Sequence, residues 1–160
     1  AYARTLISLG EEDPRLVVVD ADLSSSTRTI LFQERFPERF FNTGISEPNL
    51  IGMAAGLALC DRTVFASTFA VFATGRAWDQ VRQSICYNQA NVKIVATHGG
   101  ITVGEDGATH QSNEDVALMR VLPNMRVIVP SDSRQTEEVI RTVHKAVSYT
   151  PLTLPTIYSV

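Results

Sequence analysis

The sequence predicts an α/β protein with an open, mostly parallel sheet and helices on both faces. Short apolar segments rich in β-branched residues alternate with longer stretches that favour helix. The apolar segments are also nearly continuous, whereas strands with one solvated face alternate apolar and polar residues. This pattern is typical of strands that are buried on both sides of a parallel sheet.

Each element can be placed from its composition. Strands are expected at RLVVVDA, TVFAST, VKIVATH and MRVIVPSD, and a short strand-like stretch at Phe41 leads into a turn at Gly44. Ser46 and Asp132 are plausible amino-terminal caps for the helices that follow them. The predicted helices cover residues 1–9, 29–35, 48–59, 74–87, 113–121 and 133–146.

Composition narrows the functional classes. The 160 residues are 44% hydrophobic and 19% charged, which suits one globular domain. The net charge is −3 without a strongly basic segment, so nucleic acid and anionic membranes are poor partners. No apolar run is long enough to cross a bilayer, and no secretion signal is recognised. Cys60 and Cys86 lack metal-ligand spacing and are interpreted as small apolar residues, so we expect a cytoplasmic protein.

Functional residues of such sheets collect in the loops after the carboxyl ends of the strands. The loops DADLSSST, NTGISEP, STFAVF and THGGITVGEDGATHQ take these positions. In the second of them, Glu47 opens a helix whose small residues (LIGMAAGLAL) predict deep packing or a subunit interface. Its carboxyl group would then be buried at the amino-terminal, positive end of the helix dipole. A buried carboxylate needs a specific partner.

The fourth loop holds two of the three histidines, with four glycines between them. His98 and His110 are separated by twelve positions and accompanied by Asp106, a spacing that matches no zinc motif. No serine lies in a nucleophile elbow. General acid–base catalysis or hydrogen bonding to a polyhydroxylated substrate is the role that best fits these residues. The alternative is that one histidine only caps the loop.

Three other residues are ambiguous from sequence alone. Phe69 and Phe72 either pack in the core or form a flat wall for a heteroaromatic ring. Asp22 either caps the loop that follows it or contributes an acid to a pocket.

These motifs together resemble the pyrimidine-binding domain of the transketolase family of thiamine-diphosphate enzymes, as in the carboxy-terminal subunit of a split transketolase. The resemblance is carried by ADL at 21–23, FFNTGISEPNLIGMAAGLA, STFAVF, THGGITVGEDGATHQ and LPNMRVIVPSD. It assigns residues 1–147 to the pyrimidine-binding domain. The tail at 148–160 lacks the arginine-bearing strand usual in the family and is interpreted as divergent, truncated or non-native sequence.

The resemblance implies a role for each candidate residue. Glu47 would hydrogen-bond the aminopyrimidine ring nitrogen and take part in catalysis, and Asp22 would lie near the thiazolium ring. Phe69 and Phe72 would line the aminopyrimidine pocket. Gly75 stands where many transketolases have a third aromatic residue, and we expect Arg76 to fill part of that space. His98, His110 and Asp106 would bind the sugar hydroxyls, with both histidines also catalytic.

No diphosphate-binding motif of the superfamily is found, so magnesium and its ligands are expected on a partner subunit or domain, with no metal site in this chain. The small-residue helix also predicts a homo-oligomer. The leading hypothesis is two-carbon ketol transfer between sugar phosphates, as in pentose-phosphate metabolism, by the assembled enzyme. The alternatives are a 2-oxo-acid dehydrogenase β-type subunit, a deoxyxylulose-phosphate-synthase-like subunit, which Thr97-His98 disfavours, and a non-catalytic scaffold.

Overall fold

The computed structural model describes residues 1–146 and 152–153. At its centre, four parallel strands form one sheet in the order β2-β1-β3-β4. The three longer strands are buried along nearly their whole length, as the continuous apolar sequence predicts. The strands are β1 (Leu16–Asp20), β2 (Phe40–Asn42), β3 (Thr63–Phe69) and β4 (Val92–Thr97).

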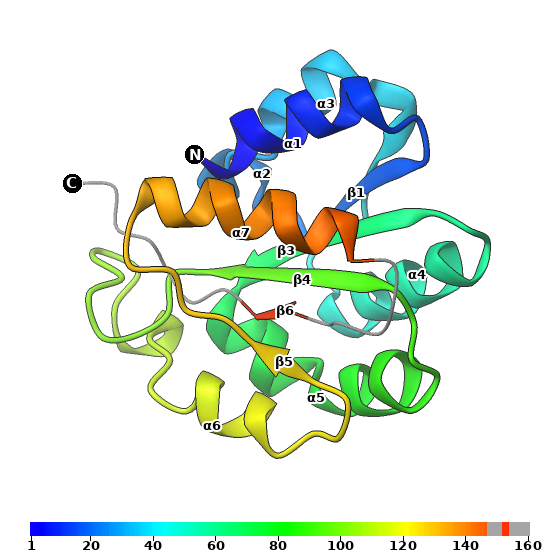
Figure 1. Cartoon of the computed structure of the whole chain (residues 1–160). Helices are drawn as coiled ribbons and strands as arrows, with labels where there is room; N and C mark the ends of the chain where they lie inside the picture. The colour runs from blue at the N-terminus through cyan, green and yellow to red at the C-terminus, as the bar shows by residue number, and fades with distance from the viewer. Residues whose placement is uncertain (147–151, 154–160) are drawn as a thin grey trace.

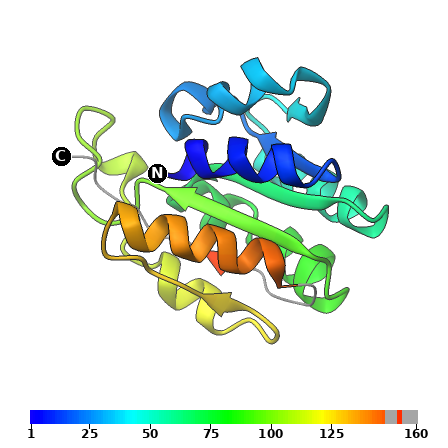
Figure 2. The ribbon, with the colours of Figure 1, turned by 45° about the horizontal axis from the view of Figure 1, so that its top comes forward.

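Helices cover both faces of the sheet, so the predicted fold class is confirmed (Figures 1 and 2). One apolar core joins Val18 and Phe65 of the sheet to α1, α3 and α7. The other joins the alternate positions Val17 and Val19 to α4, α6 and the helical segment between them. The helices are α1 (Tyr2–Glu12), α2 (Ser24–Thr27), α3 (Ile30–Arg35), α4 (Glu47–Leu59), α5 (Trp78–Gln80), α6 (Asp115–Arg120) and α7 (Ser133–Lys145).

Two predicted elements differ from the observed ones. The expected helix at 74–87 consists of π-helical turns, Phe72–Arg76 and Val81–Tyr87, on either side of α5. The Thr74 hydroxyl donates to the carbonyl of Ala70, a bond that bends helices. The expected strand at 125–132 is reduced to β5 (Arg126–Val127), which pairs with β6 (Leu152–Thr153) outside the main sheet. Pro130 cannot donate to a ladder, which limits that strand.

The small-residue helix α4 is packed on one side only. Leu50, Ile51, Ala54 and Ala55 are buried, whereas Gly52 and Gly56 are exposed, and a Cβ added to either glycine would meet nothing within 4 Å. Of the two cysteines interpreted as small apolar residues, Cys60, which follows the helix, is exposed, whereas Cys86 is buried. The helix therefore presents an unpartnered glycine face to its surroundings.

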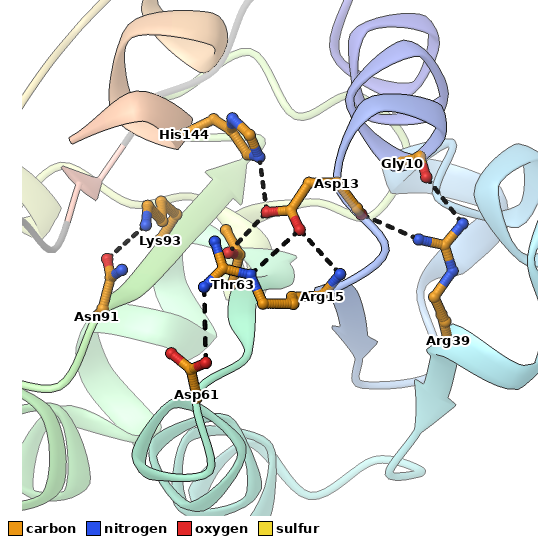
Figure 3. Close-up of polar contacts among 9 residues, drawn as sticks. All are labelled: Gly10, Asp13, Arg15, Arg39, Asp61, Thr63, Asn91, Lys93 and His144. Atoms are coloured by element: carbon orange, nitrogen blue, oxygen red, sulfur yellow. Dashed lines mark hydrogen bonds and ion pairs between the residues drawn. The ribbon is translucent and has the colours of Figure 1, made fainter. Parts of the chain in front are cut away.

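A cluster of polar side chains connects the elements at the amino-terminal edge of the sheet (Figure 3). Asp13, after α1, accepts hydrogen bonds from the Arg15 backbone N–H at 2.8 Å and the Thr63 hydroxyl at 3.0 Å. The His144 side chain of α7 is only 15% exposed and lies 3.2 Å from the same carboxylate. Lys93 is fully buried nearby and donates to Asn91. These contacts account for the polar residues here structurally, although they border a hollow of about 310 Å³.

None of the helices in the described part of the chain has the length and apolarity needed to span a bilayer.

Candidate functional site

A pocket of about 320 Å³ opens at the carboxyl-terminal edge of the sheet. The loops after β1, β2 and β3 and the glycine-rich loop after β4 all contribute to it, as expected for a parallel sheet. The lining includes Asp22, Ile45, Glu47, Phe72, Arg76 and His110.

Glu47 is the first residue of α4, and only 1% of it is exposed. Both of its carboxylate oxygens accept hydrogen bonds from Nη1 of Arg76, at 2.9 and 3.0 Å. The arginine side chain is half exposed, and its Cζ atom lies 4.5 Å from the centre of the Phe72 ring. The buried carboxylate thus has the specific partner that its burial requires, and this partner is a guanidinium at the mouth of the pocket.

Asn42 holds two of the pocket loops together. Its side-chain oxygen accepts from the backbone N–H groups of Asp22, at 3.1 Å, and Gly44, at 2.9 Å. Its amide nitrogen donates to the Asp22 carboxylate at 3.1 Å. Asp22 and Gly44 both have positive φ, which aspartate tolerates and glycine adopts freely. The carboxylate of Asp22 is therefore fixed at the rim of the pocket.

Asp20, at the end of β1, anchors the loop that carries Asp22. Its fully buried carboxylate accepts from the Leu23 backbone N–H at 2.7 Å and from the hydroxyls of Thr27 and Thr29 at 2.9 and 2.8 Å. Burial raises the pKa of Asp20, against the opposing effect of these hydrogen bonds. Sequence reasoning missed this residue, although the hydroxyl residues after it in DADLSSST were a usable signal.

Four rings form a continuous cluster behind and beside the pocket. Phe69 stacks on Phe72, with centroids 6.0 Å apart and planes 7° from parallel, and on His98, at 4.0 Å and 30°. His110 meets the Phe72 ring edge-on at 5.1 Å. Phe69 is almost completely buried and supports the pocket wall from behind, while Phe72 and His110 line it.

His98 has an unusual environment. It takes a left-handed backbone conformation with φ of 59°, and its Nδ1 lies 2.8 Å from the Thr97 hydroxyl. Burial lowers the pKa of His98, and the charge of Asp106 opposes that shift. An imidazole of this kind is neutral at neutral pH and can exchange hydrogen bonds with a substrate hydroxyl.

The structure brings the sequence-predicted residues together to different degrees. Asp22, Glu47, Phe72 and His110 all line one pocket. Phe69 and His98 lie in the ring cluster that continues from it. Asp106 is exposed in the glycine-rich loop, whose base is closed by paired backbone hydrogen bonds between Gly100 and Ser112.

Within the described residues, no group of three or more His, Cys, Asp or Glu side chains is placed to hold a metal ion. The lining of the pocket suits an organic ring, because a phenyl face stands beside a buried carboxyl group.

The chain is also similar in sequence to known proteins. A family model described as "Transketolase, pyrimidine binding domain" matches residues 1–156. Over 142 residues the chain is 60% identical to a Methanocaldococcus jannaschii protein whose name describes it as a transketolase C-terminal section, covering 89% of this chain and 45% of that protein. It is 41% identical over 134 residues to a 6-deoxy-6-sulfo-D-fructose transketolase subunit of Clostridium sp. (strain MSTE9), covering 84% and 42%. The chain spans less than half the length of these curated relatives.

Solved structures agree with this family. A split-gene transketolase described as an inactive β4 tetramer superposes with a TM-score of 0.84 at 50% identity, over 99% of this chain and 51% of that one. Transketolase from Leishmania mexicana gives 0.83 at 30% identity, over 97% and 25%. The chain belongs to the transketolase family and comprises its pyrimidine-binding domain.

Proposed function

We propose that this chain supplies the aminopyrimidine half of a thiamine-diphosphate site for two-carbon ketol transfer between sugar phosphates. The observation that carries the proposal is the buried carboxyl group of Glu47 beside the Phe72 ring in one pocket. The relatives named as transketolases support the reaction class.

The pocket has the chemistry that an aminopyrimidine ring requires. Such a ring has a flat face, which stacks on an aromatic side chain, and a ring nitrogen, which hydrogen-bonds a carboxyl group. Phe72 and Glu47 provide these two contacts from neighbouring elements. When bound, thiamine diphosphate supplies the carbon that attacks the substrate carbonyl and carries the two-carbon fragment.

The other residues would act on the substrate and the coenzyme surroundings. Asp22, at the pocket rim, would lie near the thiazolium ring. His98 and His110 would orient the sugar hydroxyls and hold protons at the reacting oxygens, and Asp106 would accept a bond from the hydroxyl next to the carbonyl. The shared ring cluster keeps both imidazoles in fixed positions relative to Phe72.

A diphosphate-binding subunit or domain would complete the site and provide the magnesium ligands. The assembled enzyme would act in the cytoplasm. The exposed glycine face of α4, with Ile45 and Leu59 also exposed at its two ends, is the surface that we expect to meet a second copy or the partner. The similar split-gene protein that forms an inactive β4 tetramer supports both self-association and the need for a partner.

The test is reconstitution of the chain with a diphosphate-binding transketolase subunit, thiamine diphosphate and magnesium. We expect transfer of a two-carbon unit from a ketose phosphate to an aldose phosphate. Glu47→Gln should lower kcat at least a hundredfold, since an amide cannot share a proton with the ring, while the exposed Glu38→Gln should match the native chain.

Other outcomes of that assay separate the alternatives. Turnover of 2-oxo acids alone would favour a dehydrogenase β-type subunit, and condensation of pyruvate with an aldose phosphate would favour a deoxyxylulose-phosphate-synthase-like subunit. If the chain forms a complex with the partner but no substrate is turned over, the chain is a non-catalytic scaffold. A sulfonated ketose is a further donor to assay, because one relative is named for 6-deoxy-6-sulfo-D-fructose.

A further inference from the structure

Arg76 occupies both of the contacts that the proposed aminopyrimidine site offers. Its Nη1 donates to both oxygens of Glu47, at 2.9 and 3.0 Å. Its guanidinium also lies over the Phe72 ring, 4.5 Å from the ring centre. A guanidinium and an aminopyrimidine are both planar, nitrogen-rich groups that stack on a phenyl face and bond a carboxyl group.

We propose that Arg76 is a positioning residue that holds Glu47 and covers Phe72 until an aminopyrimidine ring displaces it. The inference rests on the proposed function, since it concerns the same subsite. It adds that binding of the coenzyme is an exchange of one partner of Glu47 for another.

The two partners of Glu47 exclude each other chemically. A carboxyl group that donates to a neutral ring nitrogen carries a proton, whereas one whose two oxygens both accept from a guanidinium carries none. Among the described residues, Arg76 is the only side chain joined to the Glu47 carboxyl by a hydrogen bond or ion pair. Release of Arg76 therefore leaves this buried group in need of the new partner that the ring provides.

The surroundings of Arg76 allow it to leave. Half of its side chain is exposed, so it can move into solvent without crossing the packed core. It ends a π-helical turn, a distortion frequent at functional sites, directly after Gly75, where an added Cβ would meet nothing within 4 Å. Because the arginine side of this ion pair faces water, a ligand can replace it there without rearranging the packed core.

The exchange gives Arg76 a function in the unassembled chain. Without it, a carboxylate that is only 1% exposed would lie in the pocket with no opposite charge. With it, the buried charge of Glu47 is paired, and coenzyme affinity is lowered by the work of breaking the ion pair.

Three variants test the inference in the reconstituted complex. Arg76→Met removes the charge, Arg76→Lys keeps it without the planar group, and Arg82→Met changes an exposed arginine on the next turns as a matched control. Calorimetric titration with thiamine diphosphate and magnesium should give a Kd about tenfold lower for Arg76→Met, a smaller decrease for Arg76→Lys and no change for Arg82→Met.

A second measurement uses the free chain and does not depend on the coenzyme. Arg76→Met should lower the denaturant midpoint of the free chain. Adding Glu47→Gln to the Arg76→Met chain should recover most of that loss, because the amide needs no opposite charge. The inference is overturned if the native complex binds the coenzyme and the Arg76→Met complex binds it equally well or more weakly. The proposed function would still stand in that case. If the native complex binds no coenzyme, the proposed function fails and the inference falls with it.

Discussion

The imidazole ring of His98 stacks on the phenyl ring of Phe69, with centroids 4.0 Å apart and planes 30° from parallel. This contact joins the loop after β4 to the end of β3, and Phe69 in turn stacks on Phe72 in the pocket wall. The proposed substrate-binding loop and the proposed coenzyme pocket therefore share one rigid aromatic cluster.

The first prediction concerns the charge state of His98. Burial lowers the pKa of this imidazole, and the Asp106 carboxylate opposes the shift. Asp106→Asn removes the opposing charge, so the pKa of His98 should fall further below its usual value. NMR titration of the imidazole resonances measures this directly. An increase in the pKa of His98 after the substitution would contradict the arrangement described here.

The second prediction concerns the anchor of the Asp22 loop. Asp20→Ala leaves one backbone N–H and two hydroxyl groups without their buried acceptor and should cost about 2–4 kcal/mol of stability. Asp20→Asn is the matched control and should cost much less, because hydroxyl groups can rotate to accept from an amide. Denaturant unfolding compares the three chains. Equal losses for Ala and Asn would show that the hydrogen bonds do not anchor the loop.

The third prediction concerns a buried cation at the other edge of the sheet. Burial lowers the pKa of Lys93 to about 8, with the charge of Asp13 partly opposing the shift. Between pH 8 and the ordinary pKa of lysine, the unfolded chain binds more protons than the folded one. The stability of the native chain should therefore rise with pH through this window.

Lys93→Met tests that reasoning. The variant should be more stable than the native chain at pH 7, by on the order of 3 kcal/mol, because it no longer buries an ammonium group. The difference should shrink as the pH approaches 10. Lys145→Met, at an exposed position, should show neither effect. Urea unfolding at several pH values is the measurement, and a destabilised Lys93→Met chain with an unchanged pH profile would refute the assignment.

The sequence was sufficient for the fold class and for the position of Glu47. Continuous apolar, β-branched runs such as 16–19 indicate strands buried on both faces, and the small residues after Glu47 correctly predicted that this residue is buried. The prediction that Arg76 fills space near Phe72 agrees with their contact. What the sequence could not provide was the bond from Arg76 to Glu47, since 29 positions separate them and only the folded sheet brings them together.

Other features escaped prediction for similar reasons. The bond between Asp13 and His144 spans 131 positions, and nothing local marks either residue as a partner. The orientation of α4 was also open, because a helix of small apolar residues has no polar face to identify the exposed side. The tail at 148–160 lies outside the described residues except for 152–153, so its interpretation stays a prediction.

A crystal structure of the chain assembled with its diphosphate-binding partner, thiamine diphosphate and magnesium tests the proposed function most directly. We expect an oxygen of Glu47 within about 3 Å of the aminopyrimidine ring nitrogen, with the Phe72 ring stacked on the heterocycle. A coenzyme whose aminopyrimidine ring lies outside this pocket, with Glu47 still bound to Arg76, would contradict it.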